Sequence, residues 1–319
     1  MLNRLRDDVE QLASHGTRKI GTHGHLHARQ FLGSRMKQLG LKPYSGASYE
    51  LPYTVDGSAY TNLAGVWRGG QPELEPILLV SHYDTCGDQP GADDNAAAIA
   101  IWLDVISNIK SLTPFQRDII LLIPDAEEPP HFLTQHMGST NFYNQQLNHR
   151  IHCGLVLDLV GHDVPIPGMK EMVFIIGAES HPNWEEIIMN TTLPHGLTNF
   201  ATLNRYIGDL SDHHILRENS ESYLFLTCGR WEHYHSKTDR PEHLNYDKME
   251  RLSEYLGSIL RNIDATPLSR CRQEHDPLQL ELTLIKRALG DYLMDHGIRM
   301  ENRDDVQKFV MDMVKGFEL

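Results

Sequence analysis

The chain has 319 residues, of which 40% are hydrophobic and 23% charged, and its formal net charge at pH 7 is −14. This is the composition of an ordinary globular protein, and the acidic balance argues against a nucleic-acid or anionic-membrane partner, because either would need a basic face. The sequence shows no apolar core of signal-peptide length, no stretch near the roughly 20 apolar residues of a membrane span, and four singly scattered cysteines. We therefore expect a cytoplasmic protein without a nucleic-acid or membrane partner.

The predicted elements alternate between helices and strands. The first forty residues predict one or two amphipathic helices that end at Gly40. Six short apolar runs then predict strands buried on both faces, which is typical of parallel sheets; they span residues 62–67, 77–82, 118–124, 154–160, 172–177 and 223–228. Helical segments separate several of these runs, at 94–110, 138–148 and 181–192. The alternation predicts an α/β fold with a mostly parallel, mixed sheet and helices on both faces.

The character of the sequence changes near residue 265. A linker-like stretch, "TPLSRCRQEHDP", is followed by two predicted helices that continue to the last residues. We predict an α/β domain over residues 1–264 and a C-terminal helical extension over residues 265–319. The extension packs either on its own domain, which is the simpler expectation, or against a second copy in a homo-oligomer.

Polar side chains follow several of the apolar runs, at the edge where open parallel sheets bind ligands. Most of these residues are weak signals alone, because an acidic residue after a strand is usually a turn or cap residue. Asp158 is harder to explain in this way, because an unpaired carboxylate on a buried strand costs several kcal/mol, a cost that a cation would remove. The candidates are His82 and Asp84, Asp93 and Asp94, Asp125, Glu127 and Glu128, Asp158, and Glu232, His233, His235 and Asp239.

Together these side chains exceed what one tetrahedral zinc ion can use. They suit two divalent ions about 3.5–4 Å apart that share one carboxylate and activate a water molecule. In the doublet Glu127-Glu128, neighbouring side chains of extended backbone point different ways, so that one can bind a metal while the other acts as general base. Asp84, two residues after His82, can reach the second nitrogen of that imidazole and fix its tautomer.

With these motifs the sequence resembles the co-catalytic zinc aminopeptidases, which include bacterial leucyl aminopeptidases and aminopeptidase Y-like enzymes. The matching motifs run in the same order over about residues 15–262: "GTRKIGTHG", "HYDT", "GADDNAAA", "DAEE…GS", "LDL", "SDH" and "YHSKTD". The resemblance implies a zinc-exopeptidase-like fold, two Zn²⁺ ions per chain and a peptide substrate with a free N-terminus. It implies removal of the N-terminal residue by a di-zinc-activated water.

The resemblance also implies a metal-ligand set. His82 and Asp158 would bind one zinc ion, and Glu128 and His235 would bind the other. Asp93 would bridge the two ions, with an unusual cis peptide bond between Asp93 and Asp94.

Three further residues would carry the chemistry. Glu127 would be the general base, and Asp84 would orient the histidine of the first zinc ion. Tyr234 directly precedes the last histidine, where some members of the family have a tyrosine that donates to the oxyanion.

One segment departs from the family pattern. "PPHFLTQHM" (129–137) is longer than the short glycine-rich link that usually follows the glutamate pair, and together with "LDLVG" it resembles glutaminyl cyclases, which use one zinc ion on the same fold. The two aspartates of "GADD", and a tyrosine where the cyclases favour tryptophan, favour the peptidase. Two alternatives stay open: a single-zinc glutaminyl-peptide cyclotransferase, and a non-catalytic binding protein with a peptidase fold.

Overall fold

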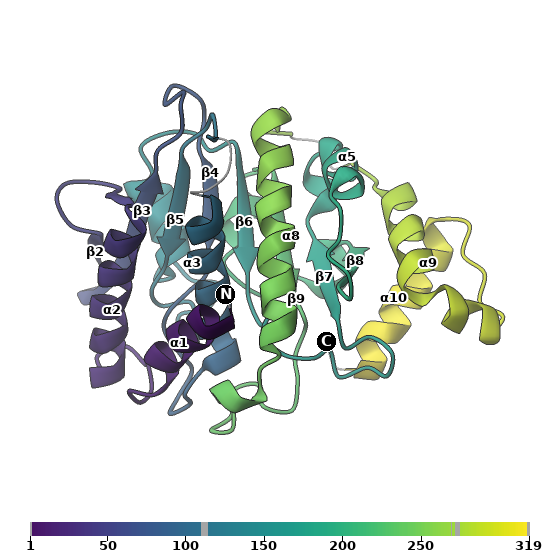
Figure 1. Cartoon of the computed structure of the whole chain (residues 1–319), viewed down its shortest axis with the longest axis horizontal. Coiled ribbons are helices and arrows are strands. Elements are labelled where there is room, and N and C mark those ends of the chain that lie inside the picture. The colour runs from purple at the N-terminus through teal and green to yellow at the C-terminus, as the bar shows by residue number, and fades with distance from the viewer. Residues whose placement is uncertain (1, 110–113, 269, 272–274, 318–319) are drawn as a thin grey trace.

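The computed structural model describes residues 2–109, 114–268, 270–271 and 275–317. Within them, nine strands form one mixed sheet in the order β1-β3-β5-β4-β6-β9-β7-β8, with β2 paired to β3 (Figure 1). Their bounds are β1 (Lys42–Pro43), β2 (Glu50–Val55), β3 (Ser58–Trp67), β4 (Ile77–Val80), β5 (Ile119–Ile123), β6 (Cys153–Leu157), β7 (Met172–Ile176), β8 (Thr198–Thr202) and β9 (Tyr223–Thr227). The strands β5, β4, β6 and β9 are parallel neighbours, whereas β3 pairs antiparallel with β5, and β7 antiparallel with β9.

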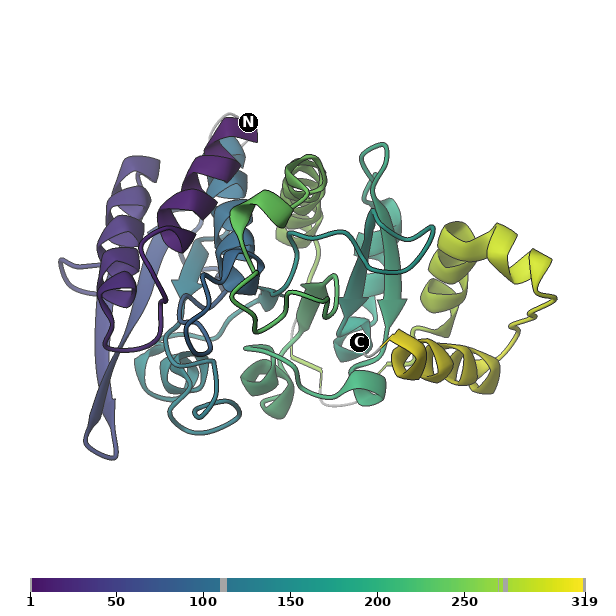
Figure 2. The same cartoon turned by 90° about the horizontal axis from the view of Figure 1, so that it is seen from below.

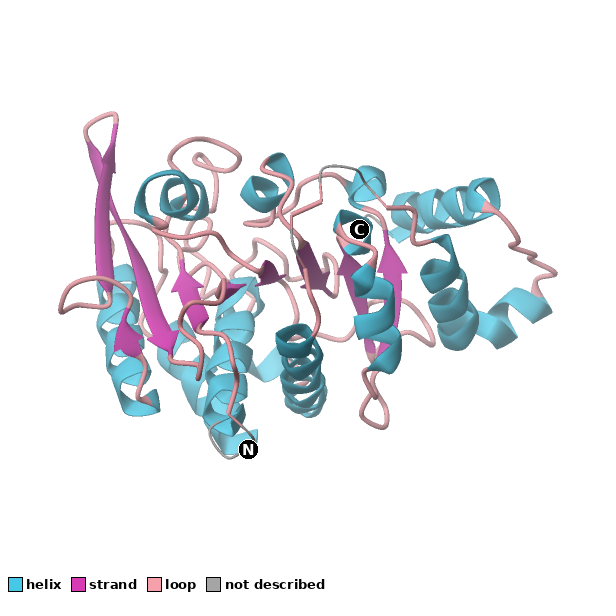
Figure 3. Cartoon of the chain, turned by 90° about the horizontal axis from the view of Figure 1, so that it is seen from above, coloured by secondary structure: helices cyan, strands magenta, loops and turns pink. Residues whose placement is uncertain are grey.

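All six predicted strands are confirmed as β3, β4, β5, β6, β7 and β9. The sequence did not indicate β1, β2 or β8. Polar and charged residues interrupt β2 ("ELPYTV") and β8 ("TNFAT"), so neither forms the continuous apolar run that marks a strand buried on both faces. The hairpin of β2 and β3 extends beyond the rest of the sheet (Figure 3).

Helices cover both faces of the sheet, which confirms the predicted fold class. The long helices α1, α2, α3 and α8 lie together on one side of the strands (Figure 2). Alternate residues of the central strands explain why those strands are apolar throughout: Ile77 and Leu79 pack into the core on the helix-rich side, and Leu78 and Val80 into the core on the other. The helices are α1 (Leu2–Ala13), α2 (His23–Leu39), α3 (Ala98–Ile109), α4 (Gly138–Asn141), α5 (Asn183–Asn190), α6 (Asn204–Ile207), α7 (His214–Glu218), α8 (Tyr246–Ala265), α9 (Leu278–Asp295) and α10 (Arg303–Phe317).

The C-terminal helices pack on their own chain. Leu282 and Ile285 of α9, with Val306 and Val310 of α10, join the same apolar cluster as Phe200 of the edge strand β8. Figure 1 shows both helices beyond β8, at the end of the sheet. The division of the chain at residue 265 and contact with a second copy stay predictions. Among the helices that the structure describes, none is both long and apolar enough to cross a membrane, and the cytoplasmic location also stays a prediction.

Candidate metal centre and active site

Five of the predicted site residues meet at one edge of the sheet. Because β5, β4, β6 and β9 are parallel, their carboxyl ends lie side by side. His82 lies two residues beyond β4, Glu127 and Glu128 follow β5, Asp158 follows β6 directly, and the loop after β9 carries His235. Strand topology therefore gathers side chains that lie up to 153 residues apart in the sequence.

One carboxylate lies between the two histidines. The Oδ1 atom of Asp94 is 3.4 Å from Nε2 of His82, and its Oδ2 atom is 3.3 Å from Nε2 of His235. Asp94 is buried in a wide turn over residues 92–97 that leads into α3. Its two carboxylate oxygens therefore face the two histidines separately.

The prediction for Asp93 is corrected by one residue. Its carboxylate faces away from the two histidines and accepts a hydrogen bond from the backbone N–H of Gly161 at 2.7 Å, while its second oxygen is 2.7 Å from Nδ1 of His162. The cis peptide bond also lies one residue later than expected, between Asp94 and Asn95. Composition cannot decide between two consecutive aspartates, because the backbone path of the turn sets which one faces the site.

The other side chains form two groups around Asp94. On one side, Nε2 of His82 is 3.5 Å from Oδ2 of Asp158 and 3.7 Å from Oε2 of Glu127. On the other side, Nε2 of His235 is 3.1 Å from Oε2 of Glu128. Ligand atoms of His82, Glu127 and Asp158 all lie within 4.8 Å of one another, and the same holds for His82, Asp94 and Glu128 and for Cys86, Glu128 and His235.

Asp84 holds the glutamate doublet in place. Its two carboxylate oxygens accept the backbone N–H groups of Glu127 and Glu128, each at 3.1 Å. The predicted contact with His82 is made chiefly by the backbone: Nδ1 is 3.2 Å from the carbonyl oxygen of Asp84 and 3.5 Å from its Oδ1 atom. Burial alone would raise the pKa of Asp84, but its hydrogen bonds to His82 and to the two backbone N–H groups lower it, so that the residue stays ionised.

Asp239, one of the predicted candidates, and Arg18, which was not among them, fix the turn that carries Asp94. The buried carboxylate of Asp239 accepts the backbone N–H groups of Asp93 and Asp94 at 2.8 and 3.1 Å, which ties the loop of His235 to this turn. The buried guanidinium of Arg18 donates to the carbonyl oxygens of Gly91 and Asp94 at 2.8 and 3.3 Å. Arg18 belongs to the "GTRKIGTHG" motif, so the signal for it was present in the sequence.

The cluster carries more negative charge than its own cations balance. Burial raises the pKa of Glu128 to about 8, and the pKa values of Glu127 and Asp158 are also raised, mainly by burial and further by neighbouring carboxylates. Burial would lower the pKa of His82, yet the charges of Glu127 and Asp158 raise it well above its usual value. Such a concentration of carboxylates in a low-dielectric site favours a bound cation.

Unpaired atoms in the cluster test whether the residues fit a metal. Within the part of the chain that the structure describes, the buried atoms Nε2 of His82 and Oδ1 of Asp158 have no hydrogen-bond partner. Buried polar atoms of this kind are normally satisfied, and imidazole nitrogen and carboxylate oxygen are the usual ligands of catalytic zinc. The donor set therefore fits zinc.

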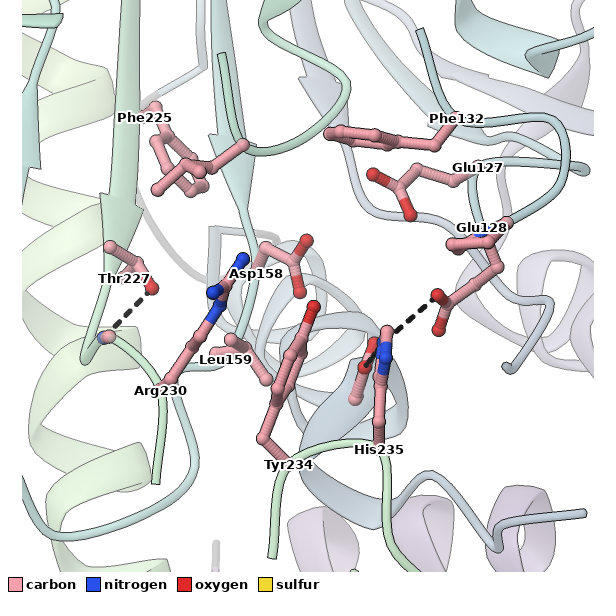
Figure 4. A pocket seen from close by; sticks show the side chains of 14 residues that line it. Glu127, Glu128, Phe132, Asp158, Leu159, Phe225, Thr227, Arg230, Tyr234 and His235 are labelled. Atoms are coloured by element: carbon pink, nitrogen blue, oxygen red, sulfur yellow. Dashed lines mark hydrogen bonds and ion pairs between the residues drawn. The ribbon is translucent and has the colours of Figure 1, made fainter. Parts of the chain in front are cut away.

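A cavity of about 330 Å³ opens over the cluster. Figure 4 shows Glu127, Glu128, Asp158 and His235 around it. The hydroxyl of Tyr234 points into the cavity, and its ring stacks on that of His235 at 3.9 Å between centroids. Burial raises the pKa of Tyr234, so that its hydroxyl keeps its proton. Apolar side chains line other parts of the wall: Phe132, Leu159, Leu210 and Phe225.

Asp212, which was not among the predicted candidates, is buried near the cluster. Burial followed by the charge of Asp158 raises its pKa to about 7, although His82 opposes the shift. Its place in the "SDH" motif was the available signal in the sequence. His213 does not line the cavity but stacks behind Phe225, with 4.3 Å between the ring centroids.

Known proteins share this sequence pattern. Residues 62–260 match Peptidase family M28. The uncharacterized protein YfbL of Escherichia coli is 24% identical over 67% of this chain and 74% of its own length. Endoplasmic reticulum metallopeptidase 1 of Mus musculus is 22% identical over 82% of this chain, but the match spans only 30% of that protein.

Solved structures share the fold. LapB from Legionella pneumophila has a TM-score of 0.67 at 16% identity, over 83% of this chain and 73% of its own. A Zn-dependent exopeptidase from Parabacteroides distasonis has a TM-score of 0.65 at 17% identity, over 83% and 98%. A glutaminyl cyclase from Fimbriiglobus ruber has a TM-score of 0.64 at 20% identity, over 82% and 95%. The family match covers more than half of the chain, including the residues from His82 to His235 that form the candidate metal centre, and so this chain belongs to Peptidase family M28.

Proposed function

We propose that this chain is an aminopeptidase that binds two zinc ions and hydrolyses the first peptide bond of a substrate with a free N-terminus. The position of Asp94 carries the proposal, because its two oxygens face different ligand groups. His82 and Asp158 would hold one ion, Glu128 and His235 the other, and Asp94 both. When bound, such ions lower the pKa of a water molecule and polarise a carbonyl group.

Glu127 is the proposed general base. It is buried at the cavity wall, and burial raises its pKa, so that its carboxylate is a stronger proton acceptor than that of an exposed glutamate. Asp84 supports this role because it holds the backbone N–H of Glu127. Nδ1 of His82 donates to the carbonyl oxygen of Asp84, which leaves the lone pair of Nε2 for a metal.

Tyr234 is the proposed donor to the oxygen that becomes negative during the reaction. Its hydroxyl faces the cavity and keeps its proton, as an oxyanion donor requires. The apolar wall near Phe132 and Phe225 suits an uncharged side chain.

Glutaminyl-peptide cyclisation is the second candidate. It is supported by the cyclases among the similar folds and by the long segment 129–137, which places Phe132 in the cavity wall. A cyclase polarises the side-chain carbonyl of an N-terminal glutamine and releases ammonia, so that a second zinc ion would be surplus. The non-catalytic alternative has less support, because every ligand position carries a competent side chain.

One set of assays separates these candidates. Zinc-loaded protein is offered aminoacyl-amides and short peptides, with and without N-acetylation, alongside an N-terminal glutaminyl peptide. We expect cleavage of the free-amine substrates, loss of cleavage on acetylation, inhibition by a zinc chelator, and two zinc ions per chain by elemental analysis. Ammonia release from the glutaminyl peptide with one zinc ion and no peptide cleaved would instead establish the cyclase. No turnover of either kind with full zinc loading would support the binding protein.

A further inference from the structure

A second, apolar hollow lies beside the candidate active site. It encloses about 40 Å³ and shares Leu210, Thr227 and Gly229 with the larger cavity. The Oγ1 atom of Thr227 accepts the backbone N–H of Gly229 at 3.0 Å, so that this polar atom is satisfied within its own loop. The remaining lining residues are Phe174, Ile176, Phe200, Thr202, Ile207, Val310 and Met313.

The two hollows lie next to each other on one face of the sheet. Phe225 and Thr227 of β9 point to the same face because they are two residues apart. Phe174 of β7 pairs in register with Thr227, and Phe200 of β8 pairs with Phe174. The apolar hollow therefore continues the catalytic cavity sideways over β7 and β8, with Gly229, which has no side chain, at their boundary.

The far wall of this hollow comes from the C-terminal extension. Val310 and Met313 belong to α10, outside the residues 62–260 that match the peptidase family. Arg303, at the start of α10, forms an ion pair with the fully buried Glu281 of α9 and donates to the hydroxyl of Tyr206 in α6 at 3.3 Å. These contacts fix α10 beside the loops of the active site.

We propose that α10 forms the far wall of a side-chain subsite, which takes the apolar end of the substrate's N-terminal residue. This inference rests on the proposed aminopeptidase function and adds a specificity to it. The hollow, at about 40 Å³, exceeds the roughly 10–15 Å³ that one water molecule needs, and it is much smaller than the neighbouring cavity of about 330 Å³. We expect it to take the terminal methyl groups of methionine or leucine in preference to an aromatic ring, and to gain little from the short side chain of alanine.

The first test substitutes two valines of α10 and compares the same alanine substitution at both. Val306 and Val310 are both buried, but only Val310 lines the hollow. We expect Val310→Phe, which fills the hollow, to lower kcat/KM for methionyl and leucyl amides about 10-fold relative to alanyl amide, a typical effect for one or two methylene groups. Val310→Ala, which enlarges the hollow, should raise kcat/KM for phenylalanyl amide relative to leucyl amide. Val306→Ala, the matched control, should change stability and leave the ratios between substrates unchanged.

The second test measures the binding of amino-acid amides to a variant that is expected not to hydrolyse them. Zinc-loaded Glu127→Gln protein with ¹³C-labelled methionine methyl groups is titrated with L-methioninamide or L-alaninamide, and Met313 is assigned through Met313→Leu. We expect the Met313 methyl resonance to shift with L-methioninamide and to stay in place with L-alaninamide.

The outcomes separate the subsite from the reaction. A Met313 resonance that shifts in a protein without peptidase activity would support the subsite and reject the aminopeptidase. An active peptidase would overturn the subsite if its Met313 resonance does not move and its Val310 variants affect all substrates equally.

Discussion

Asp93 and Asp94 are neighbours in the chain, yet their carboxylates serve opposite sides of the same turn. Asp93 is hydrogen-bonded to Gly161 and His162, whereas Asp94 lies between His82 and His235. One aspartate therefore supports the turn, and the other belongs to the candidate metal centre.

Substitution of each aspartate by asparagine should impair different properties of the protein. We expect Asp94→Asn to reduce the zinc content and to lower kcat by 100-fold or more, because it removes the charge shared by the two ligand groups. Asp93→Asn should keep zinc but destabilise the fold by about 1.5–3 kcal/mol, the usual value of a hydrogen bond to a charged group. Elemental analysis and urea unfolding of both variants check this. If Asp93→Asn loses zinc while Asp94→Asn keeps its zinc and its activity, Asp93 is the bridging ligand, as the sequence predicted.

Glu127 and Glu128 form a second matched pair. Glu127→Gln should retain both zinc ions and lower kcat 10²–10⁴-fold, the usual contribution of a general base. Glu128→Gln should lose one zinc ion, since its Oε2 atom faces His235 at 3.1 Å. Metal analysis combined with steady-state kinetics distinguishes the two. If both variants keep full metal and activity, this doublet is not the catalytic pair.

The ion pair of Arg303 and Glu281 should hold α10 against α9. Arg303→Met leaves a buried carboxylate without its cation, which typically costs 3–5 kcal/mol. We expect a loss of about 3 kcal/mol in urea unfolding, and recovery of most of it when Glu281→Met is added. Substitution of the exposed Met294 of α9 by alanine is the control and should have little effect. An unchanged stability of Arg303→Met would mean that the ion pair contributes little to folding.

His152 should make the fold less stable in acid. Its Nε2 atom donates to the carbonyl oxygen of Thr266 at 2.9 Å, and burial, followed by the charge of Arg117, lowers its pKa to about 4. In the unfolded chain the pKa is near 6.5, so between pH 6.5 and 4 the unfolded state binds more protons than the folded state. Stability should therefore fall as the pH drops through this window, by at most about 1.4 kcal/mol per pH unit.

Urea unfolding of wild type and His152→Gln between pH 4.5 and 8 measures this effect. The variant should be less stable than wild type at pH 8, and the difference should shrink toward pH 4.5. A constant difference would show that His152 does not contribute to the pH dependence.

The central fold and most of the candidate site were predictable from the sequence. Strands buried on both faces must be apolar throughout, so runs such as residues 77–82 and 118–124 indicated a parallel sheet before any contact was known. A carboxylate such as Asp158 at the end of a buried strand is costly without a partner. The convergence of such residues at four strand ends therefore indicated a metal site.

Three features depended on the tertiary structure, for a common physical reason. The choice between Asp93 and Asp94 follows from the backbone path of one turn and from the carboxylate of Asp239, which lies 145 residues away from Asp94. The wall that Phe132 and Phe225 form brings the segment after β5 next to strand β9, and the local sequence does not specify the path of the segment that carries Phe132. The place of α10 depends on the ion pair between Arg303 and Glu281. Periodicity and composition indicate which residues of a segment face solvent and which face the core. Contacts between segments that are distant in the sequence decide which side chains share a site.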